Sequence, residues 1–272
     1  MSKSRFPAVA GSFYPGNPVV LAGEIDAMLE EAAYRASRGN GRSCPKAVIV
    51  PHAGYVYSGP VAAGAYARVR SGNGVTRRVV LLGPVHRVAI HGLALPAAAV
   101  FETPLGSIPL DGDACGLLRA FPQITVNEHA HALEHSLEVQ LPFLQRVLGA
   151  FSLIPLAVGD VRPEMVAEVL DCLWGGEETL IVVSSDLSHY LPYDTANLVD
   201  QETVRILLNL ELIPSYGQAC GAVPVNGIIT AARRRRLVPE LIDLRNSGDT
   251  GGDKGRVVGY ASIAFYEEVS HV

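Results

Sequence analysis

The sequence predicts an α/β fold, a three-layer α/β/α sandwich with a mixed, largely parallel central sheet. Four short apolar runs rich in β-branched residues are typical of strands that are buried on both faces. Segments with helical periodicity lie between these runs, and alternating strands and helices indicate a sheet covered on both sides. With 272 residues, 49% of them hydrophobic, the chain is long enough to bury this core as a single domain spanning residues 1–272.

The expected elements follow from these runs. The four strands are Lys46–Val50, Arg77–Gly83, Phe151–Val158 and Thr179–Ser185. The expected helices have the approximate bounds Pro18–Ala36, Gly59–Arg70, Asp113–Phe121, Glu134–Leu148, Pro163–Leu173 and Asp194–Leu210. Three segments are expected to add antiparallel edge strands: His91–Pro96, Glu240–Ser247 and Arg256–Glu268. The stretch Ala36–Cys44 is interpreted as a loop within the domain.

The charge pattern argues against nucleic acid and membranes as partners. Formal net charge is −5, and acids and bases are interspersed, so no broad basic field is expected. The run Arg233–Arg236 is interpreted as the last turn of a helix, where cations complement the dipole, in preference to an anion site. No apolar stretch reaches the roughly 18 to 20 residues that span a bilayer. With no signal-peptide pattern at the N-terminus, a cytoplasmic protein is expected.

One short motif suggests a zinc peptidase. The stretch HALEH, His131 to His135, fits H-x-x-E-H, in which two histidines bind zinc and the glutamate activates water. A helix starting at Glu134 would leave His131 outside its first turn, so the two histidines would not share a face. We therefore interpret the match as accidental and place His131 in a surface loop. His135 has two interpretations, a pocket-lining residue or a structural histidine at a helix start.

Histidines follow three of the expected strands. His52 comes after the first strand, His86 after the second, and Asp186 and His189 after the fourth. In open α/β sheets, ligands bind beyond the carboxyl ends of the strands, where these residues should meet. Neutral imidazole suits zinc, iron and copper. The sequence also lacks dinucleotide, phosphate-loop and nucleophile-elbow motifs, so it predicts a metal site there.

Nine ordered sequence blocks between Phe6 and Glu267 carry a specific resemblance. They are PAVAGSFYPG, PHAGYVYSG, LLGPVHR, FETPLG, EHSLEVQLPFL, SSDLSHY, ACGAVPVNG, RNSGDT and VVGYASIAFYE. Together they resemble the Memo-like family, also called AmmeMemoRadiSam system protein B. That family is similar in fold to the class III extradiol ring-cleaving dioxygenases, which bind ferrous iron through two histidines and a carboxylate and use a further histidine as acid/base.

The resemblance implies a ligand set with a thiolate in place of the carboxylate. It makes His52, His86 and Cys220 the metal ligands, and His189 the acid/base group with Asp186 beside it. The resemblance makes iron(II) the expected metal, with copper or zinc as alternatives. A thiolate is soft and can itself be oxidised, so the fold does not by itself imply ring cleavage. From the residues alone, a helix starting near Pro224 would lower the pKa of the Cys220 thiol. Three further residues from the matching blocks are expected in the pocket: Glu134, His135 and Tyr55.

Three functions remain open from the sequence. The first is a metal-dependent oxidoreductase acting on an unknown small molecule or peptide. The second is a catalytically inactive module that binds peptides or proteins in the same crevice, since Memo-like proteins of animals are linked to phosphotyrosine-bearing peptides and cell motility. The third, implied by the other family name, is an accessory subunit with radical S-adenosylmethionine and AMMECR-type partners. This chain lacks the clustered cysteines of an iron–sulfur site, so radical chemistry would belong to the partner.

Overall fold

Four parallel strands form the centre of the sheet, and all four coincide with the predicted apolar runs. They lie in the order β2 (Ala47–Val50), β9 (Thr179–Ser184), β3 (Arg78–Pro84) and β8 (Ser152–Val158). Nearly every residue of these strands is buried, and successive side chains enter opposite cores, as the two-residue period of a strand requires. The structure, a computed structural model, describes residues 4–36, 44–214 and 217–268.

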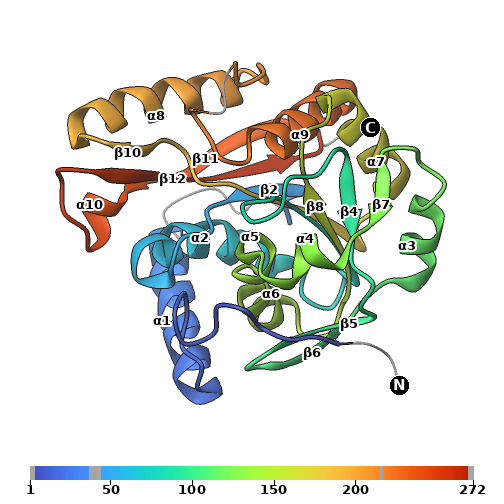
Figure 1. Ribbon diagram of the computed structural model, residues 1–272. Coiled ribbons are helices and arrows are strands. Elements are labelled where there is room, and N and C mark those ends of the chain that lie inside the picture. The colour runs from blue at the N-terminus through green and yellow to red at the C-terminus, as the bar shows by residue number, and fades with distance from the viewer. Residues whose placement is uncertain (1–3, 37–43, 215–216, 269–272) are drawn as a thin grey trace.

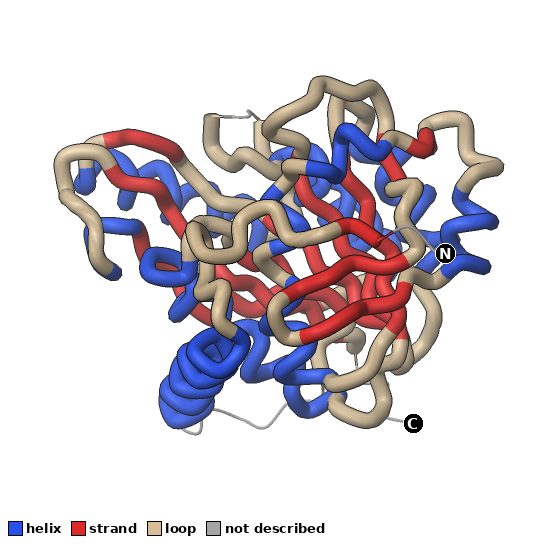
Figure 2. Tube along the Cα trace, turned by 60° about the horizontal axis from the view of Figure 1, so that its bottom comes forward, coloured by secondary structure: helices blue, strands red, loops and turns tan. Residues whose placement is uncertain are grey.

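Antiparallel strands extend the sheet on both sides, as predicted. On one side, β12 (Val257–Tyr266) pairs with β2 and with β11 (Val238–Asn246) and β10 (His189–Leu191). On the other, β4 (Leu93–Leu95) runs antiparallel to β8 and carries β7 (Ile124–Val126). A small second sheet was not predicted. It contains β1 (Ser4–Arg5), β5 (Val100–Thr103) and β6 (Gly106–Pro109) and lies in front of the central sheet in Figure 2.

Helices cover both faces of the sheet (Figure 1). One core contains side chains of α1 (Pro18–Ala36), α2 (Tyr55–Val69), α4 (Glu128–Ala132) and α6 (Leu141–Leu148). The other contains side chains of α3 (Gly112–Leu118), α7 (Pro163–Leu173), α8 (Tyr193–Leu208) and α9 (Ala222–Arg235). The described residues also contain two four-residue helices, α5 (His135–Glu138) and α10 (Ser247–Thr250). The predicted α/β/α architecture is confirmed.

The predicted helix Glu134–Leu148 is wrong as a continuous element. It is divided into α5 and α6, and Pro142 stands in the first turn of α6. A proline has no N–H and its ring clashes with the carbonyl four residues earlier, here that of Glu138, which is where α5 ends. Most of the predicted loop Ala36–Cys44, residues 37–43, lies outside the described residues. Within the described ranges, no helix combines the length and apolar character that a bilayer span needs.

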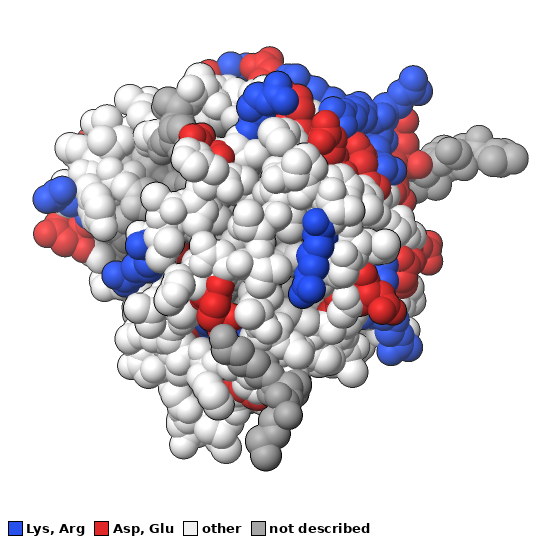
Figure 3. Space-filling model, turned by 45° about the vertical axis from the view of Figure 1, so that its right-hand side comes forward, with Lys and Arg blue, Asp and Glu red and all other residues white. Residues whose placement is uncertain are grey.

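Charges of both signs are intermingled on the face shown in Figure 3, beside wide uncharged areas. The arginine run illustrates this mixture. It forms the last turn of α9, as predicted, and Arg234 and Arg235 both pair with Asp171 at 2.8 and 2.9 Å. The Arg235 guanidinium also lies 4.1 Å from the centre of the Trp174 ring. Arg234 and Arg235 are therefore engaged in ion pairs or packing on the protein surface.

Candidate metal centre

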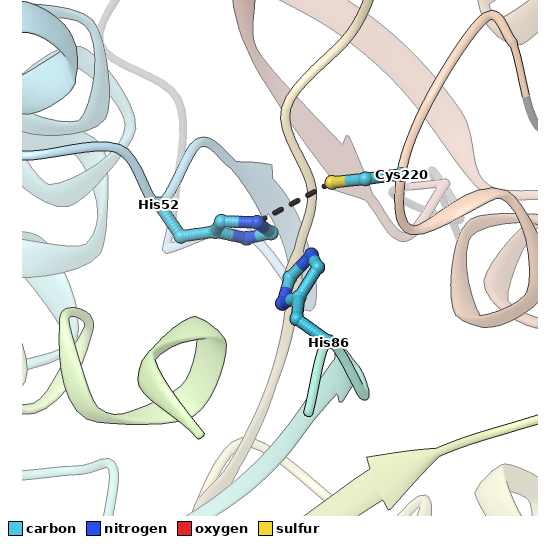
Figure 4. Close-up of side chains that lie close together, drawn as sticks. All are labelled: His52, His86 and Cys220. Atoms are coloured by element: carbon cyan, nitrogen blue, oxygen red, sulfur yellow. Dashed lines mark hydrogen bonds between the residues drawn. The ribbon is translucent and has the colours of Figure 1, made fainter. Parts of the chain in front are cut away.

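Three side chains from separate segments converge at the carboxyl end of the sheet (Figure 4). His52 follows β2, His86 follows β3, and Cys220 lies just before α9. Because β9 runs between β2 and β3, the two histidines flank the end of that strand. The ligand atoms of the three residues all lie within 4.8 Å of one another, and Cys220 Sγ is 3.3 Å from His52 Nε2. These atoms form a candidate metal-binding group.

The cysteine is fixed above the end of β9 by its own backbone. The amide of Cys220 donates to the Asp186 carbonyl at 3.3 Å, and the amide of Gly221 donates to Ser185 Oγ at 2.9 Å. A Cβ on Gly221 would lie 2.7 Å from the Ser185 Cβ, a distance at which carbon atoms clash. Glycine is therefore the residue that allows this close approach, and it places the Cys220 sulfur near the two histidines.

Glu134 orients His86. One carboxylate oxygen accepts the backbone amide of His86 at 2.6 Å, and the other accepts its ring Nδ1 at 2.9 Å and the Ser136 amide at 2.9 Å. Burial would raise the pKa of Glu134, but the hydrogen bonds and charge of His86 and the amide bonds together lower it to about 2. A carboxylate only accepts, so Nδ1 carries a proton, and in the neutral ring Nε2 has the lone pair that can bind a metal. Metal-binding histidines are commonly oriented in this way.

His52 and Cys220 are more deeply buried. Burial, together with the neighbouring His86 and His135 rings, holds the pKa of His52 well below its usual range, so this ring is neutral. Burial and the Asp186 carboxylate raise the pKa of the Cys220 thiol to about 12. The expectation that helix amides would lower this pKa is wrong, because desolvation outweighs them; α9 begins at Ala222, two residues before the expected start. Without a metal the group is a thiol.

His135 lies against both histidines of this group. Its ring centroid is 5.4 Å from that of His52 and 4.7 Å from that of His86. His86, Glu134 and His135 form a second group with metal-ligand spacing. The Glu134 oxygens already accept three hydrogen bonds from His86 and Ser136, however, so this carboxylate is engaged. The first group has no carboxylate engaged in this way and fits a metal better.

An open cleft of about 440 Å³ lies close to the candidate ligands, and its wall includes His135, whose ring lies against His52 and His86; the three ligands themselves do not line it. His135, Asp186 and His189 line it, so the structure brings the predicted acid/base pair to the same cavity. His189 Nδ1 donates to the Leu187 carbonyl at 2.8 Å, which leaves Nε2 without a proton while the ring is neutral. Asp186 accepts the backbone amide of His52 at 2.7 Å, and burial raises its pKa. The cleft thus offers a base next to the candidate ligands.

Comparisons with known proteins identify the family. The family model described as Memo-like protein matches residues 5–264. The chain belongs to the Memo-like family. A MEMO1 family protein of Aquifex aeolicus is 36% identical over 273 residues, covering 96% of this chain and 98% of that protein. One from Sulfolobus acidocaldarius is 32% identical over 281 residues, with 96% and 99% coverage.

A solved structure supports the fold alone. An uncharacterized protein of Escherichia coli K12 superimposes with a TM-score of 0.52 at 12% sequence identity. The match covers 80% of this chain and 98% of that one. At this identity the similarity extends to the arrangement of the sheet and its helices and assigns no chemistry.

Tyr55 does not line the cleft of this Memo-like chain. The residue is 4% exposed, its hydroxyl donates to the Val139 carbonyl at 2.8 Å, and its ring packs on Phe143. Tyr57 lines the cleft instead. Two positions along a helix are about 200° apart around its axis, so within α2 the two tyrosines face opposite ways. Phe13, which the sequence did not single out, also lines the cleft and lies 4.8 Å from His135 between ring centroids.

The placement of His131 in a surface loop is wrong. His131 is 1% exposed and lies in α4, where its Nε2 donates to the Ala94 carbonyl at 2.8 Å. Burial lowers its pKa to about 4. His135 belongs to the next helix, α5. The two histidines of HALEH therefore do not share a helix face, which supports the interpretation of the motif match as accidental.

Proposed function

We propose that this Memo-like chain is a metal-dependent oxidoreductase that holds one iron(II) ion through His52, His86 and Cys220. A single observation carries the proposal. One imidazole nitrogen from each of His52 and His86 and the half-buried Cys220 sulfur lie within 4.8 Å of one another, close to an open cleft. Buried polar groups normally pair with groups elsewhere in the protein. Two imidazole nitrogens and a sulfur that converge on one point are instead typical of the ligands of a metal ion. A bound iron(II) ion would supply redox and Lewis-acid chemistry.

The other residues have separate roles in the proposal. The substrate enters the cleft between His135 and His189. His189 accepts a proton from it at Nε2, since Nδ1 is held by the Leu187 carbonyl. Asp186 holds the His52 backbone in place by accepting a hydrogen bond from the His52 amide. Glu134 fixes the ring of His86. The buried position of His52, 1% exposed, excludes water from that side of the site.

The chemistry of the three ligand residues limits which metal ions suit the site. Two imidazoles and a thiolate suit iron, copper and zinc, while magnesium and calcium prefer oxygen ligands. Iron(II) is the first choice because the Memo-like fold resembles the ferrous ring-cleaving dioxygenases. Copper(I), which favours soft thiolates, is the second.

Anaerobic purification followed by elemental analysis tests the proposal. We expect about one iron per chain in the wild type and less than a tenth of that in His52→Ala and in Cys220→Ser. His91→Ala is the matched control, because the His91 side chain is 94% exposed and lies outside the site. Equal metal content in all four proteins, or none in any, would contradict the proposal. Finding one copper or zinc ion per chain would support the same three ligands and identify a metal other than iron.

A second candidate function is peptide or protein binding without catalysis. The exposed aromatic rings at the cleft support it: Tyr190 is 62% exposed and Tyr57 40%. Such rings are common in recognition surfaces. A phosphotyrosine peptide that bound metal-free wild type and His189→Ala equally well would favour this function. The radical S-adenosylmethionine and AMMECR-type partners stay predictions, which co-purification would test.

A further inference from the structure

A buried chain of hydrogen bonds lies behind His52, on the side away from Cys220. Tyr66 donates to Gln140 Oε1 at 2.9 Å, and Gln140 Nε2 donates to Ser184 Oγ at 2.9 Å. Ser184 Oγ is also 2.9 Å from His52 Nδ1. All four residues are 0 or 1% exposed. They come from α2, the α5–α6 connection, the end of β9 and the segment after β2, so the chain joins several parts of the core.

Two backbone carbonyls fix the direction of every bond in this chain. Gln140 Nε2 lies 2.9 Å from the carbonyl of Pro51, which can only accept, so the amide nitrogen must face that way. Its second hydrogen then goes to Ser184 Oγ. Ser184 donates its own hydrogen to the Ser136 carbonyl at 2.7 Å. The hydroxyl of Ser184 therefore has only an acceptor position left for His52.

The ring of His52 must therefore donate from Nδ1. A neutral imidazole carries one proton, so Nε2 keeps its lone pair. That nitrogen is the atom 3.3 Å from Cys220 Sγ. We propose that Ser184, oriented by Gln140 and the Ser136 carbonyl, is a positioning residue that holds His52 in the Nδ1–H tautomer and so prepares Nε2 to bind metal. The metal part of this inference rests on the proposed function; the tautomer does not.

The two histidines are thus oriented by different chemistry. His86, 28% exposed in its side chain, has a carboxylate partner, Glu134. His52, 2% exposed, has a neutral hydroxyl partner. Two carboxylates, Asp186 and Glu134, already lie near the site, and a third buried charge would carry a large desolvation penalty. A hydroxyl held by carbonyls and an amide gives the same orientation without adding charge.

Nitrogen-15 NMR of the metal-free protein tests the tautomer directly. Two-bond correlations from the ring protons distinguish a protonated from an unprotonated ring nitrogen, and His52→Gln assigns the signals. We expect protonated Nδ1 and unprotonated Nε2 in the wild type. Ser184→Ala should show a mixture of tautomers, and Ser184→Thr, which keeps the hydroxyl, should restore the wild-type pattern. Ser262→Ala is the control, since Ser262 is fully buried on β12 and its hydroxyl has no partner within the described ranges.

A metal titration of the same four proteins gives the second readout. Ser184→Ala should bind iron(II) roughly 10-fold more weakly than the wild type, and Ser184→Thr and Ser262→Ala within about twofold of it. An Nε2–H tautomer in the wild type, or an unchanged tautomer in Ser184→Ala, would overturn the inference whatever the metal affinity. Absence of metal binding by the wild type, with the expected tautomers, would overturn the proposed function and leave Ser184 as the residue that sets the His52 tautomer.

Discussion

The two ends of the central sheet carry hollows of similar size but different chemistry. At the amino end, a pocket of about 430 Å³ surrounds Lys46. Its ammonium donates to the carbonyls of Gly176 at 2.7 Å, Thr179 at 2.9 Å and Gly175 at 3.5 Å, so its three hydrogens are used. At the carboxyl end, beside the 440 Å³ cleft, the lone pairs of His52 and His86 face a thiol. The two hollows therefore differ less in volume than in whether their polar atoms can still bind a ligand, and only the atoms of the candidate site can.

Removing the ligands should have the largest effect. The double variant His52→Ala, His86→Ala loses both nitrogen donors, whereas Lys46→Met changes only the opposite end of the sheet. Loss of a group that merely orients a ligand costs roughly 10- to 100-fold in affinity, so loss of two ligands should exceed about 100-fold. Isothermal titration with iron(II) under nitrogen measures the difference. If Lys46→Met weakened metal binding as much as the double variant, the contrast between the two ends would be wrong.

Glu134→Gln should have the next largest effect on the metal. Three donors converge on the Glu134 oxygens, and the amide nitrogen of glutamine would place a fourth donor against them. The ring of His86 would lose its fixed orientation. We expect metal affinity to fall roughly 10- to 100-fold. Competition with a chelator of known affinity measures this, with Glu102→Gln as a control far from the site. Wild-type affinity in Glu134→Gln would show that His86 needs no carboxylate partner.

Lys46→Met should affect stability alone. The substitution keeps the length of the side chain but leaves the Gly176 and Thr179 carbonyls without their donor. Losing these bonds, one of them to a buried residue, should lower the free energy of unfolding by ~1–2 kcal/mol. Urea denaturation of the metal-free protein, monitored by the single tryptophan, measures it. Unchanged stability would mean that solvent replaces the lysine without cost.

Metal affinity should also depend on pH, through the thiol of Cys220. Its pKa of about 12 lies above that of an ordinary cysteine, so binding as a thiolate must release one proton. Raising the pH toward 12 removes this cost. Between about pH 8 and 9.5, affinity should rise roughly tenfold per pH unit, about 1.4 kcal/mol. Cys220→Ser should give a slope near zero. A flat profile in the wild type would mean that the sulfur does not bind as a thiolate.

The sequence predicted the centre of the fold well and its periphery poorly. The helices Pro18–Ala36 and Pro163–Leu173 have the predicted bounds, and each of the four buried strands differs from its prediction by one residue at one or both ends. These segments have long or strongly apolar patterns. The small sheet was missed because its strands have two to four residues and alternate with solvent-exposed positions. Such short pairings are decided by tertiary contacts and leave no clear periodicity.

The residues of the candidate site that directly follow strands of the sheet could be predicted from the sequence. His52, His86 and His189 follow parallel strands or their extension, and parallel strands end at one edge. Cys220 came from the family resemblance, because its loop reaches β9 through the Gly221–Ser185 contact, 36 residues apart in sequence. Ser184 was not predicted as a functional residue, since a serine ending an apolar strand gives no sign of the partner its hydroxyl will meet.

Cobalt(II) titration tests the central claim most directly, because it detects the sulfur ligand itself. Cobalt(II) bound by two histidines and Cys220 should give an intense near-ultraviolet thiolate-to-cobalt band that saturates at about one equivalent per chain. Cys220→Ser should lose this band while keeping weaker visible absorption from the histidines, and Cys115→Ser should match the wild type. A wild-type protein that bound cobalt(II) without the thiolate band, or bound none, would contradict the site formed by His52, His86 and Cys220.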